Sequence, residues 1–377
     1  MLIVGVPKET KERERRVALT PDSVRALVSA GYEVRVETDA GLNSFFVDAN
    51  YTDAGAKIVS SLNDLYGQSD IILRVNPPSV AEVAMMKKEA VLLSLMFAAT
   101  NPSLIEACAR QGITAFSVDA IPRISRAQKM DVLSSQANLA GYKAVIIGAA
   151  ALGKIFPLLM TAAGTIKPSR VVIMGAGVAG LQAIATAKRL GAIVEVSDIR
   201  PETKEQVESL GGKFIELTGD DSIKLEGGYV KNVSEEFLKK QQALIAKHIA
   251  AADLVITTAL IPGKKAPVLI TDEMVKSMRM GSVIVDMAVE QGGNCTLSEL
   301  NKNVVHNGVT IIGESNLPSL LPLNASELYA KNISTFLLHL SSASGFKWEL
   351  EEEITKGSLI VYKGTPVHPS VLPAITA

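Results

Sequence analysis

The chain has 377 residues, which is long for a single hydrophobic core, so we expect two domains of ordinary size. Lysine and arginine (38) nearly balance aspartate and glutamate (39), and the formal net charge of −1 gives no sign of a nucleic-acid partner or of an anionic membrane surface. The most apolar region, residues 144–164, is interrupted by Lys154 and Pro157, and Cys108 and Cys295 match no metal-ligand spacing, so we expect neither a membrane span nor a metal site.

The N-terminal third of the chain alternates short apolar runs with helical patterns, which predicts an α/β domain with a parallel sheet. Helices are expected over Pro21–Ala30 and Pro102–Gln111, each with proline at the start and glycine just past the end. Because the first strand-like run begins at Leu2, no signal peptide is expected. No glycine-rich turn follows that strand, so this domain is expected to resemble a Rossmann domain without a nucleotide of its own. The predicted strands are Leu2–Val6, Glu33–Val36, Ile71–Val75, Val91–Met96 and Ile113–Val118.

A polar segment, PRISRAQKMDVLSSQAN (Pro122–Asn138), follows the last of these strands. Ligands of doubly wound sheets bind at the carboxyl ends of the strands, so its side chains could hydrogen-bond a ligand at this edge of the sheet. The alternative is helix capping by Asp131 or Ser134, with the other side chains solvated. The candidate residues are Arg123, Gln128, Asp131, Ser134 and Ser135, and the helix predicted over Ser134–Ala151 leads into the second domain.

The second domain opens with a dinucleotide fingerprint. The apolar strand Arg170–Met174 runs directly into Gly175-Ala176-Gly177-Val178-Ala179-Gly180, which begins a helix predicted to end at Leu190. The first glycine permits the tight turn, the second lets the backbone approach a pyrophosphate, and the third lets the helix pack closely on the sheet. A second strand, Ile193–Val196, follows at the expected place, so we predict a dinucleotide site.

The residues after this second strand favour NAD over NADP. Asp198 could accept hydrogen bonds from the adenine ribose, and its carboxylate would repel a 2′-phosphate. Ile199 and Arg200 follow it and are included in the expected site, although an arginine here could also accommodate that phosphate. NAD(H) is therefore the expected nucleotide.

The rest of the chain continues the βα pattern, with one interruption at Thr218–Val233 that is too long for a routine connection. From the sequence alone this segment is either an irregular insertion or a lid. The long helix predicted over Ala325–Leu340 returns the chain to the first domain, so we expect domains of residues 1–140 with 325–377 and of residues 141–324. Further helices are predicted at Glu202–Leu210 and Ser234–Ala251, further strands at Lys213–Glu216, Leu254–Thr257, Ser282–Asp286 and Thr310–Gly313, and a variable tail at Ser341–Ala377.

The sequence holds little of the machinery of acid–base or nucleophilic catalysis. Its four histidines (His248, His306, His339 and His368) are scattered, and His248 and His339 lie in helical patterns where a structural or solvated role is expected. Hydride transfer between nicotinamides needs no nucleophile or metal, only two rings held face to face with water excluded.

Several segments together resemble one family. They are RVALTP (Arg16–Pro21), PRISRAQKMDVLSSQANLAGYKAV (Pro122–Val145), MTAAGTIKPSRVVIMGAGVAGLQAIATAKRLGA (Met160–Ala192), TKEQVESLGGKF (Thr203–Phe214), TTALIPGKKAPVLIT (Thr257–Thr271) and DMAVEQGGN (Asp286–Asn294). The chain resembles the NAD(H)-binding component, domain I or alpha subunit, of proton-translocating nicotinamide nucleotide transhydrogenase, over nearly its whole length.

This resemblance implies two Rossmann-type doubly wound domains with a nucleotide cleft between them, and direct hydride transfer between NAD(H) here and NADP(H) on a partner subunit, coupled to proton translocation. It also implies membrane-spanning partner subunits, a homodimer, and a cytoplasmic location at the inner face of the cell membrane. By the same resemblance, Arg123, Gln128, Asp131 and Ser134 orient the dihydronicotinamide, with Gln128 nearest the hydride path. The fingerprint and Asp198 hold the adenosine diphosphate, and Tyr229 belongs to a mobile loop that closes over the nucleotide.

Alanine dehydrogenase is the alternative, because that family shares the two-domain plan and Arg16 matches its carboxylate-binding arginine. The chain departs from it at three places, however: LRVN (Leu73–Asn76) stands where that family has LKVK, Leu95-Met96 has no histidine, and Glu290 replaces an aspartate. An amino-acid dehydrogenase must polarise a carbonyl and move a proton, and these positions offer no clear means. A third hypothesis is a non-catalytic NAD-binding regulator.

Overall fold

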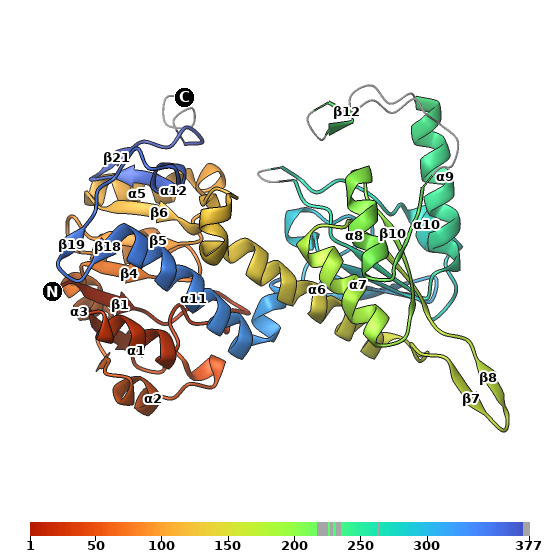
Figure 1. The fold of residues 1–377 in the computed structure, drawn as a ribbon, viewed down its shortest axis with the longest axis horizontal. Helices are drawn as coiled ribbons and strands as arrows, with labels where there is room; N and C mark the ends of the chain where they lie inside the picture. Colours follow the sequence, from red (N-terminus) through yellow and green to blue (C-terminus); the bar gives the residue numbers. More distant parts are fainter. Residues whose placement is uncertain (217–224, 227–228, 231–234, 262–263, 372–377) are drawn as a thin grey trace. The chain divides into compact units, whose positions relative to one another are not determined.

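The computed structural model describes residues 1–216, 225–226, 229–230, 235–261 and 264–371. The chain divides into two compact units, Met1–Gln136 with Pro318–Ala377 (unit 1) and Ala137–Leu317 (unit 2). Each unit is an α/β structure built on one mainly parallel sheet, which confirms the predicted fold class (Figure 1). The predicted domain limits, after residues 140 and 324, lie slightly further along the chain than the limits of these units and stay a prediction.

The sheet of unit 1 has the strand order β21-β20-β6-β5-β4-β1-β2-β3. Its six strands from β3 to β6 are parallel and follow the doubly wound order 3-2-1-4-5-6. Strands β4 to β6 are buried along their whole length, as expected of parallel strands covered on both faces. The strands are β1 (Ile3–Val6), β2 (Glu33–Glu37), β3 (Lys57–Val59), β4 (Ile71–Leu73), β5 (Val91–Ser94), β6 (Thr114–Ser117), β20 (Leu359–Tyr362) and β21 (Thr365–Pro366).

Helices cover both faces of this sheet (Figure 1). On one face, the apolar side chains of α1 (Pro21–Ser29) and α11 (Pro322–Leu340) form a core with alternate strand residues such as Ile71 and Leu73. On the other face, Ile72 and Leu92 pack with side chains of the remaining helices. These helices are α3 (Leu62–Gln68), α4 (Val80–Met85) and α5 (Pro102–Gln111), and α2 (Asp48–Asp53) and α12 (Glu353–Ser358) complete the unit.

The C-terminal segment differs from the prediction. Residues 341–377 were expected to be a variable tail, but β20 pairs antiparallel with β6 and β21 pairs antiparallel with β20, which extends the sheet at that edge. Ile360 and Val361 are fully buried there. The run LIVY is short and follows a polar segment, so its pattern alone did not mark it as belonging to a distant sheet.

The sheet of unit 2 has the order β11-β10-β9-β14-β15-β17-β16 and is parallel except for the edge strand β16. Its first strand, β9, lies between β10 and β14, so the strand order reverses there, which is where doubly wound sheets bind nucleotides. The strands are β9 (Arg170–Met174), β10 (Ile193–Ser197), β11 (Lys213–Phe214), β14 (Leu254–Thr257), β15 (Val283–Asp286), β16 (Asn303–His306) and β17 (Val309–Ile312).

The helices predicted for unit 2 are present, but the helix Asp272–Ser277, the edge strand β16 and two short antiparallel hairpins were not predicted. The antiparallel hairpin of β7 (Leu159–Thr161) and β8 (Gly164–Ile166) projects from the unit (Figure 1). Of the segment Thr218–Val233, only β12 (Leu225–Glu226) and β13 (Tyr229–Val230) are described, and the rest lies outside the described residues. The helices are α6 (Val132–Ala151), which begins in unit 1, α7 (Val178–Arg189), α8 (Lys204–Ser209), α9 (Glu235–Ala251) and α10 (Asp272–Ser277).

Candidate functional site

The turn between β9 and α7 contains the three fingerprint glycines, and steric contacts within the fold require a glycine at two of these positions. Gly175 has φ +109°, which L side chains rarely adopt, and a Cβ on it would collide with the Thr258 side chain. A Cβ on Gly180 would overlap the carbonyl oxygen of Gly175. These two glycines therefore allow the turn and the close packing of α7 on β9.

Gly177 is different, because a Cβ on it would meet no described atom within 4 Å. Its backbone, at φ −76° and ψ −171°, is also open to any residue. Gly177 is the N-cap of α7, and no side chain from the described residues caps this helix. The first-turn amides and the helix dipole therefore offer an anion site, and the missing side chain leaves room for a pyrophosphate to approach.

Asp198 lies at the end of β10, beside this turn, and is held by two partners. Its Oδ2 accepts a hydrogen bond of 2.6 Å from the backbone amide of Ala176. Arg200 donates to both carboxylate oxygens, from Nε to Oδ1 and from Nη2 to Oδ2, each at 3.0 Å. Burial alone would raise the pKa of Asp198, but the bonds from Arg200 and Ala176 hold it below the usual value.

The Asp198–Arg200 pair qualifies the predicted role of the carboxylate. The Asp198 side chain is 5% exposed and that of Arg200 is 43% exposed, so the guanidinium is the more accessible group. Neighbouring Ile199 is exposed. Asp198 thus ties the second strand to the fingerprint turn, and its bond to the adenine ribose stays a prediction.

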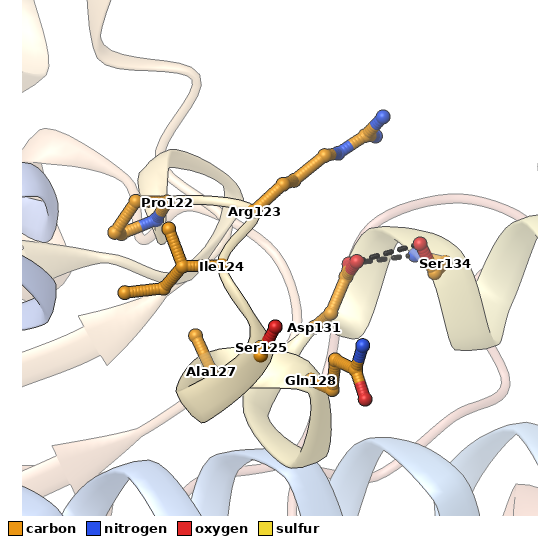
Figure 2. A pocket seen from close by; sticks show the side chains of 8 residues that line it. All are labelled: Pro122, Arg123, Ile124, Ser125, Ala127, Gln128, Asp131 and Ser134. Atoms are coloured by element: carbon orange, nitrogen blue, oxygen red, sulfur yellow. Dashed lines mark hydrogen bonds between the residues drawn. The ribbon is translucent and has the colours of Figure 1, made fainter.

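In unit 1, the polar loop forms a pocket of about 420 Å³ (Figure 2). Its lining includes all four residues predicted to orient the nicotinamide, Arg123, Gln128, Asp131 and Ser134, together with Pro122, Ile124, Ser125 and Ala127. Sequence positions up to eleven apart are brought together because residues 125–130 form a short 3-10 helix, Ser125–Met130, that turns directly into α6. The structure thus brings these four side chains together around one pocket, and their role toward a nicotinamide stays a prediction.

The four side chains have different surroundings. Asp131 caps α6, with its Oδ1 accepting from the Ser134 amide at 2.8 Å and its Oδ2 from the Ser134 hydroxyl at 2.6 Å. Arg123 and Gln128 are exposed, and neither side chain makes a hydrogen bond with the described residues. Figure 2 shows the Arg123 side chain extending away from the loop. The capping interpretation thus holds for Asp131 and Ser134, and the two free donors at Arg123 and Gln128 remain available to a ligand.

Tyr229, the residue expected to close over the nucleotide, belongs to β13. Most of the surrounding segment lies outside the described residues, and the lid role of Tyr229 stays a prediction.

A buried ionic cluster in unit 1 was not predicted as such. The Arg16 guanidinium is paired with Glu14, from Nε to Oε1 at 2.8 Å and from Nη2 to Oε2 at 2.7 Å, and it also donates to Gln136. The side chains of Arg16 and Glu14 are 6% and 0% exposed. Burial alone would raise the pKa of Glu14, but Arg16 and Asn76 lower it to about 2. Arg16, the first residue of RVALTP and the match to the carboxylate-binding arginine of alanine dehydrogenase, is therefore neutralised within the protein.

Thr258 supports the fingerprint turn and Asn294 holds the loop that follows Thr258, and the sequence pattern did not single out either residue. The Thr258 hydroxyl lies 3.2 Å from the carbonyl oxygens of Met174 and Gly175. The Asn294 side chain accepts from the Ala259 amide and donates to the Ala259 and Pro267 carbonyls. Both residues act on the segment that follows β14, a relation visible only once the strands are ordered in the sheet.

Matches to known proteins extend over nearly the whole chain. Residues 5–140 match the family model "Alanine dehydrogenase/PNT, N-terminal domain" and residues 144–369 match "Alanine dehydrogenase/PNT, C-terminal domain". An NAD(P) transhydrogenase subunit alpha chain of Rhodospirillum rubrum is 50% identical over 98% of both chains. The crystal structure of transhydrogenase from Sinorhizobium meliloti matches with a TM-score of 0.89 and 45% identity, covering 97% of this chain and 100% of that one.

Alanine dehydrogenase is a more distant relative. The enzyme of Bacillus subtilis is 30% identical over 98% of this chain and 94% of its own length. None of the described helices is both long and apolar enough to cross a membrane. With both of its domain models matched and full-length relatives at up to 50% identity, the chain belongs to the alanine dehydrogenase/PNT family and is most similar, among these relatives, to the transhydrogenase alpha subunits.

Proposed function

We propose that this chain is the NAD(H)-binding subunit of a proton-translocating transhydrogenase. It exchanges a hydride directly between NAD(H) bound here and NADP(H) bound by a partner subunit, and this exchange is coupled to proton movement through membrane-spanning partners. The observation that carries the proposal is the fingerprint at the β9–α7 turn, where a Cβ on Gly177 would meet no described atom within 4 Å. The match over 98% of both chains with the Rhodospirillum rubrum subunit supports the same activity.

The adenosine diphosphate half of NAD(H) would be held in unit 2. The amides at the start of α7 would bind the pyrophosphate, along the stretch Gly175–Gly180. Asp198, Ile199 and Arg200 would lie at the adenine ribose, with Asp198 keeping the Arg200 guanidinium in place. A carboxylate already neutralised by an arginine discriminates against a 2′-phosphate less strongly than a free one, so we expect a preference for NAD(H) that is not absolute.

The nicotinamide half would be oriented by the polar loop of unit 1. Arg123 and Gln128 are donors without partners in the described structure, while Asp131 and Ser134 fix the start of α6 and the shape of the pocket. Gln128 would lie nearest the hydride path. No group here needs to act as nucleophile or metal ligand, because the chain's contribution is to hold one ring in place for the other and to exclude water.

We also propose a homodimer. The β7–β8 hairpin exposes Leu159, Met160 and Ile166, and an isolated two-stranded hairpin is marginally stable in water. An apolar hollow of about 760 Å³, lined by residues that include Ile155 and Pro157 close to the root of the hairpin, offers a surface that the hairpin of a second copy could cover. The dimer would stay cytoplasmic, at the inner face of the cell membrane, by binding its membrane-spanning partners.

The alanine dehydrogenase alternative is disfavoured by the buried cluster. The arginine that matches that family's substrate-binding residue is Arg16. Its guanidinium group already donates hydrogen bonds to Glu14, from Nε and Nη2, and to Gln136, from Nη1. A substrate carboxylate would have to displace the buried Glu14, and the histidine and lysine of that family are absent.

Reconstitution tests the proposal. The isolated chain should bind NADH, reduce no NADP⁺ by itself, and catalyse the transfer when mixed with the NADP(H)-binding and membrane subunits. L-alanine with NAD⁺ is the matched control reaction. NADH binding without any transfer in the mixture would favour a regulator, and turnover of L-alanine at an appreciable rate would favour the dehydrogenase.

A further inference from the structure

The Gln128 side chain has no hydrogen bond of its own in the described structure, so its position depends on the backbone that carries it. That backbone is the 3-10 helix Ser125–Met130, which is exposed at Ser125, Arg126, Gln128 and Lys129, and the Arg126 side chain, 64% exposed, pairs with Glu352 at 3.2 Å. Ala127 and Met130 are buried and hold the helix to the core of unit 1. Apolar contacts of this kind are not directional and an exposed ion pair holds its geometry only weakly, so a buried directional contact is needed to set the orientation of the turn.

Asn332 supplies directional contacts on both sides of this turn. Its Nδ2 donates a 2.8 Å hydrogen bond to the backbone carbonyl of Lys129, the residue after Gln128. Its Oδ1 accepts a hydrogen bond from the Ser135 hydroxyl, in the first turn of α6. The side chain is only 9% exposed. One buried amide therefore joins the end of the 3-10 helix to the start of α6, with Asp131 between them.

The element that carries Asn332 is rigid. It lies in the middle of α11, where its neighbours Ile333, Phe336 and Leu337 are fully buried in the core. A buried amide with both its donor and its acceptor satisfied has one favourable orientation, because losing either bond would leave a buried polar group unpaired. Side chains of a site are best positioned by such supporting hydrogen bonds from rigid elements.

We infer that Asn332 is a positioning residue for hydride transfer, which holds the turn bearing Gln128 and thereby sets where its amide lies against the nicotinamide. This inference rests on the proposed function. Asn332 is not among the residues that line the pocket, so it should affect the alignment of the rings and not the affinity for NADH.

The test uses three variants of the full chain. Asn332→Leu removes both hydrogen bonds while keeping the branched shape of the side chain, and Asn332→Asp keeps an acceptor for Ser135 but cannot donate to Lys129 when ionised. Thr335→Val is the matched control on the same helix, because it loses only a local bond from its hydroxyl to the Lys331 carbonyl. Each variant is measured for NADH affinity by calorimetry, for transfer rate with the partner subunits, and for amide hydrogen exchange over residues 125–131.

In Asn332→Leu the transfer rate should fall by up to about 100-fold, the loss expected for a displacement of about 1 Å at the reacting groups. The NADH Kd should be unchanged, and the amides of residues 125–131 should exchange faster. Asn332→Asp should also lose transfer rate, because its carboxylate faces the Lys129 carbonyl that the native amide binds, and Thr335→Val should behave as the native chain.

Native transfer rate and native exchange in Asn332→Leu would overturn the inference, as would a loss of NADH affinity and thermal stability that matches the loss of rate. Hydrogen exchange is measured on the chain alone, so it tests the role of Asn332 even if the native complex transfers no hydride. The absence of transfer in the native complex would instead contradict the proposed function.

Discussion

Alanine substitutions at two glycines of the fingerprint separate what the fold needs from what the nucleotide needs. In Gly180→Ala the new Cβ would overlap the Gly175 carbonyl oxygen, so α7 must move away from β9. We expect destabilisation by about 1–3 kcal/mol or more, as for overpacking of a core. In Gly177→Ala the Cβ meets no described atom and the backbone angles are allowed. Alanine lowers the conformational entropy of the unfolded chain, which stabilises the fold, but it is a weaker N-cap than glycine, so the free energy of unfolding should change by less than about 1 kcal/mol.

The same Gly177→Ala methyl group would project into the space assigned to the pyrophosphate. A misfit of about 1.5–3 kcal/mol would weaken NADH binding roughly 10- to 100-fold. Urea denaturation gives the stability of both variants, and calorimetry gives their NADH affinity. The reasoning is refuted if Gly177→Ala binds NADH as tightly as the native chain, or if Gly180→Ala is as stable as the native chain.

Three further predictions address the polar loop, the buried cluster and the hairpin. Gln128→Asn should slow transfer in the reconstituted complex by about 10- to 100-fold with little change in NADH affinity, and lost affinity with normal turnover would contradict the role given to Gln128. Glu14→Gln should lower the free energy of unfolding by about 3–5 kcal/mol at pH 7, because the buried Arg16 loses its counter-charge. The pKa of Glu14 is lowered to about 2 in the folded chain, so its contribution to stability is fully present above about pH 4.5 and is lost as the pH falls toward 2. In urea denaturation, the difference in unfolding free energy between the native and Glu14→Gln chains should therefore shrink over that pH window. A difference that stays constant would exclude this ion pair as the cause. Met160→Asp, at an exposed position of the hairpin, should convert the proposed dimer to monomers in sedimentation experiments, and an unchanged dimer would remove the hairpin from the interface.

The sequence predicts well those regions of the fold in which burial and local geometry both produce a recognisable pattern of residues. Strand β14 is buried along its whole length and β9 is buried except at Arg170, so both read as apolar runs. The glycines of the β9–α7 turn are required by contacts within the turn or with Thr258, which follows the neighbouring strand β14. The β7–β8 hairpin and β20 were missed because one is exposed and the other joins a strand more than 200 positions earlier in the chain. Neither situation gives a short-range pattern.

The candidate site likewise has features that the sequence predicts and features that it does not. The grouping of Arg123, Gln128, Asp131 and Ser134 could be predicted because a single turn carries them. Their individual surroundings could not, since the bond from Asn332 to Lys129 joins residues 203 positions apart. The pairing of Asp198 with Arg200 is local, but whether a carboxylate faces a ligand or a neighbouring arginine depends on side-chain orientation, which spacing alone does not determine.

Tracing the hydride tests the central claim most directly. NADH carrying deuterium at the transferred position of its nicotinamide is mixed with NADP⁺, this chain and its partner subunits, and the NADPH formed is examined by mass spectrometry. Direct exchange between two bound rings predicts that the deuterium appears in NADPH without loss to water, and that none appears when this chain is left out. Label lost to the solvent, or NADPH formed equally well without this chain, would contradict the account.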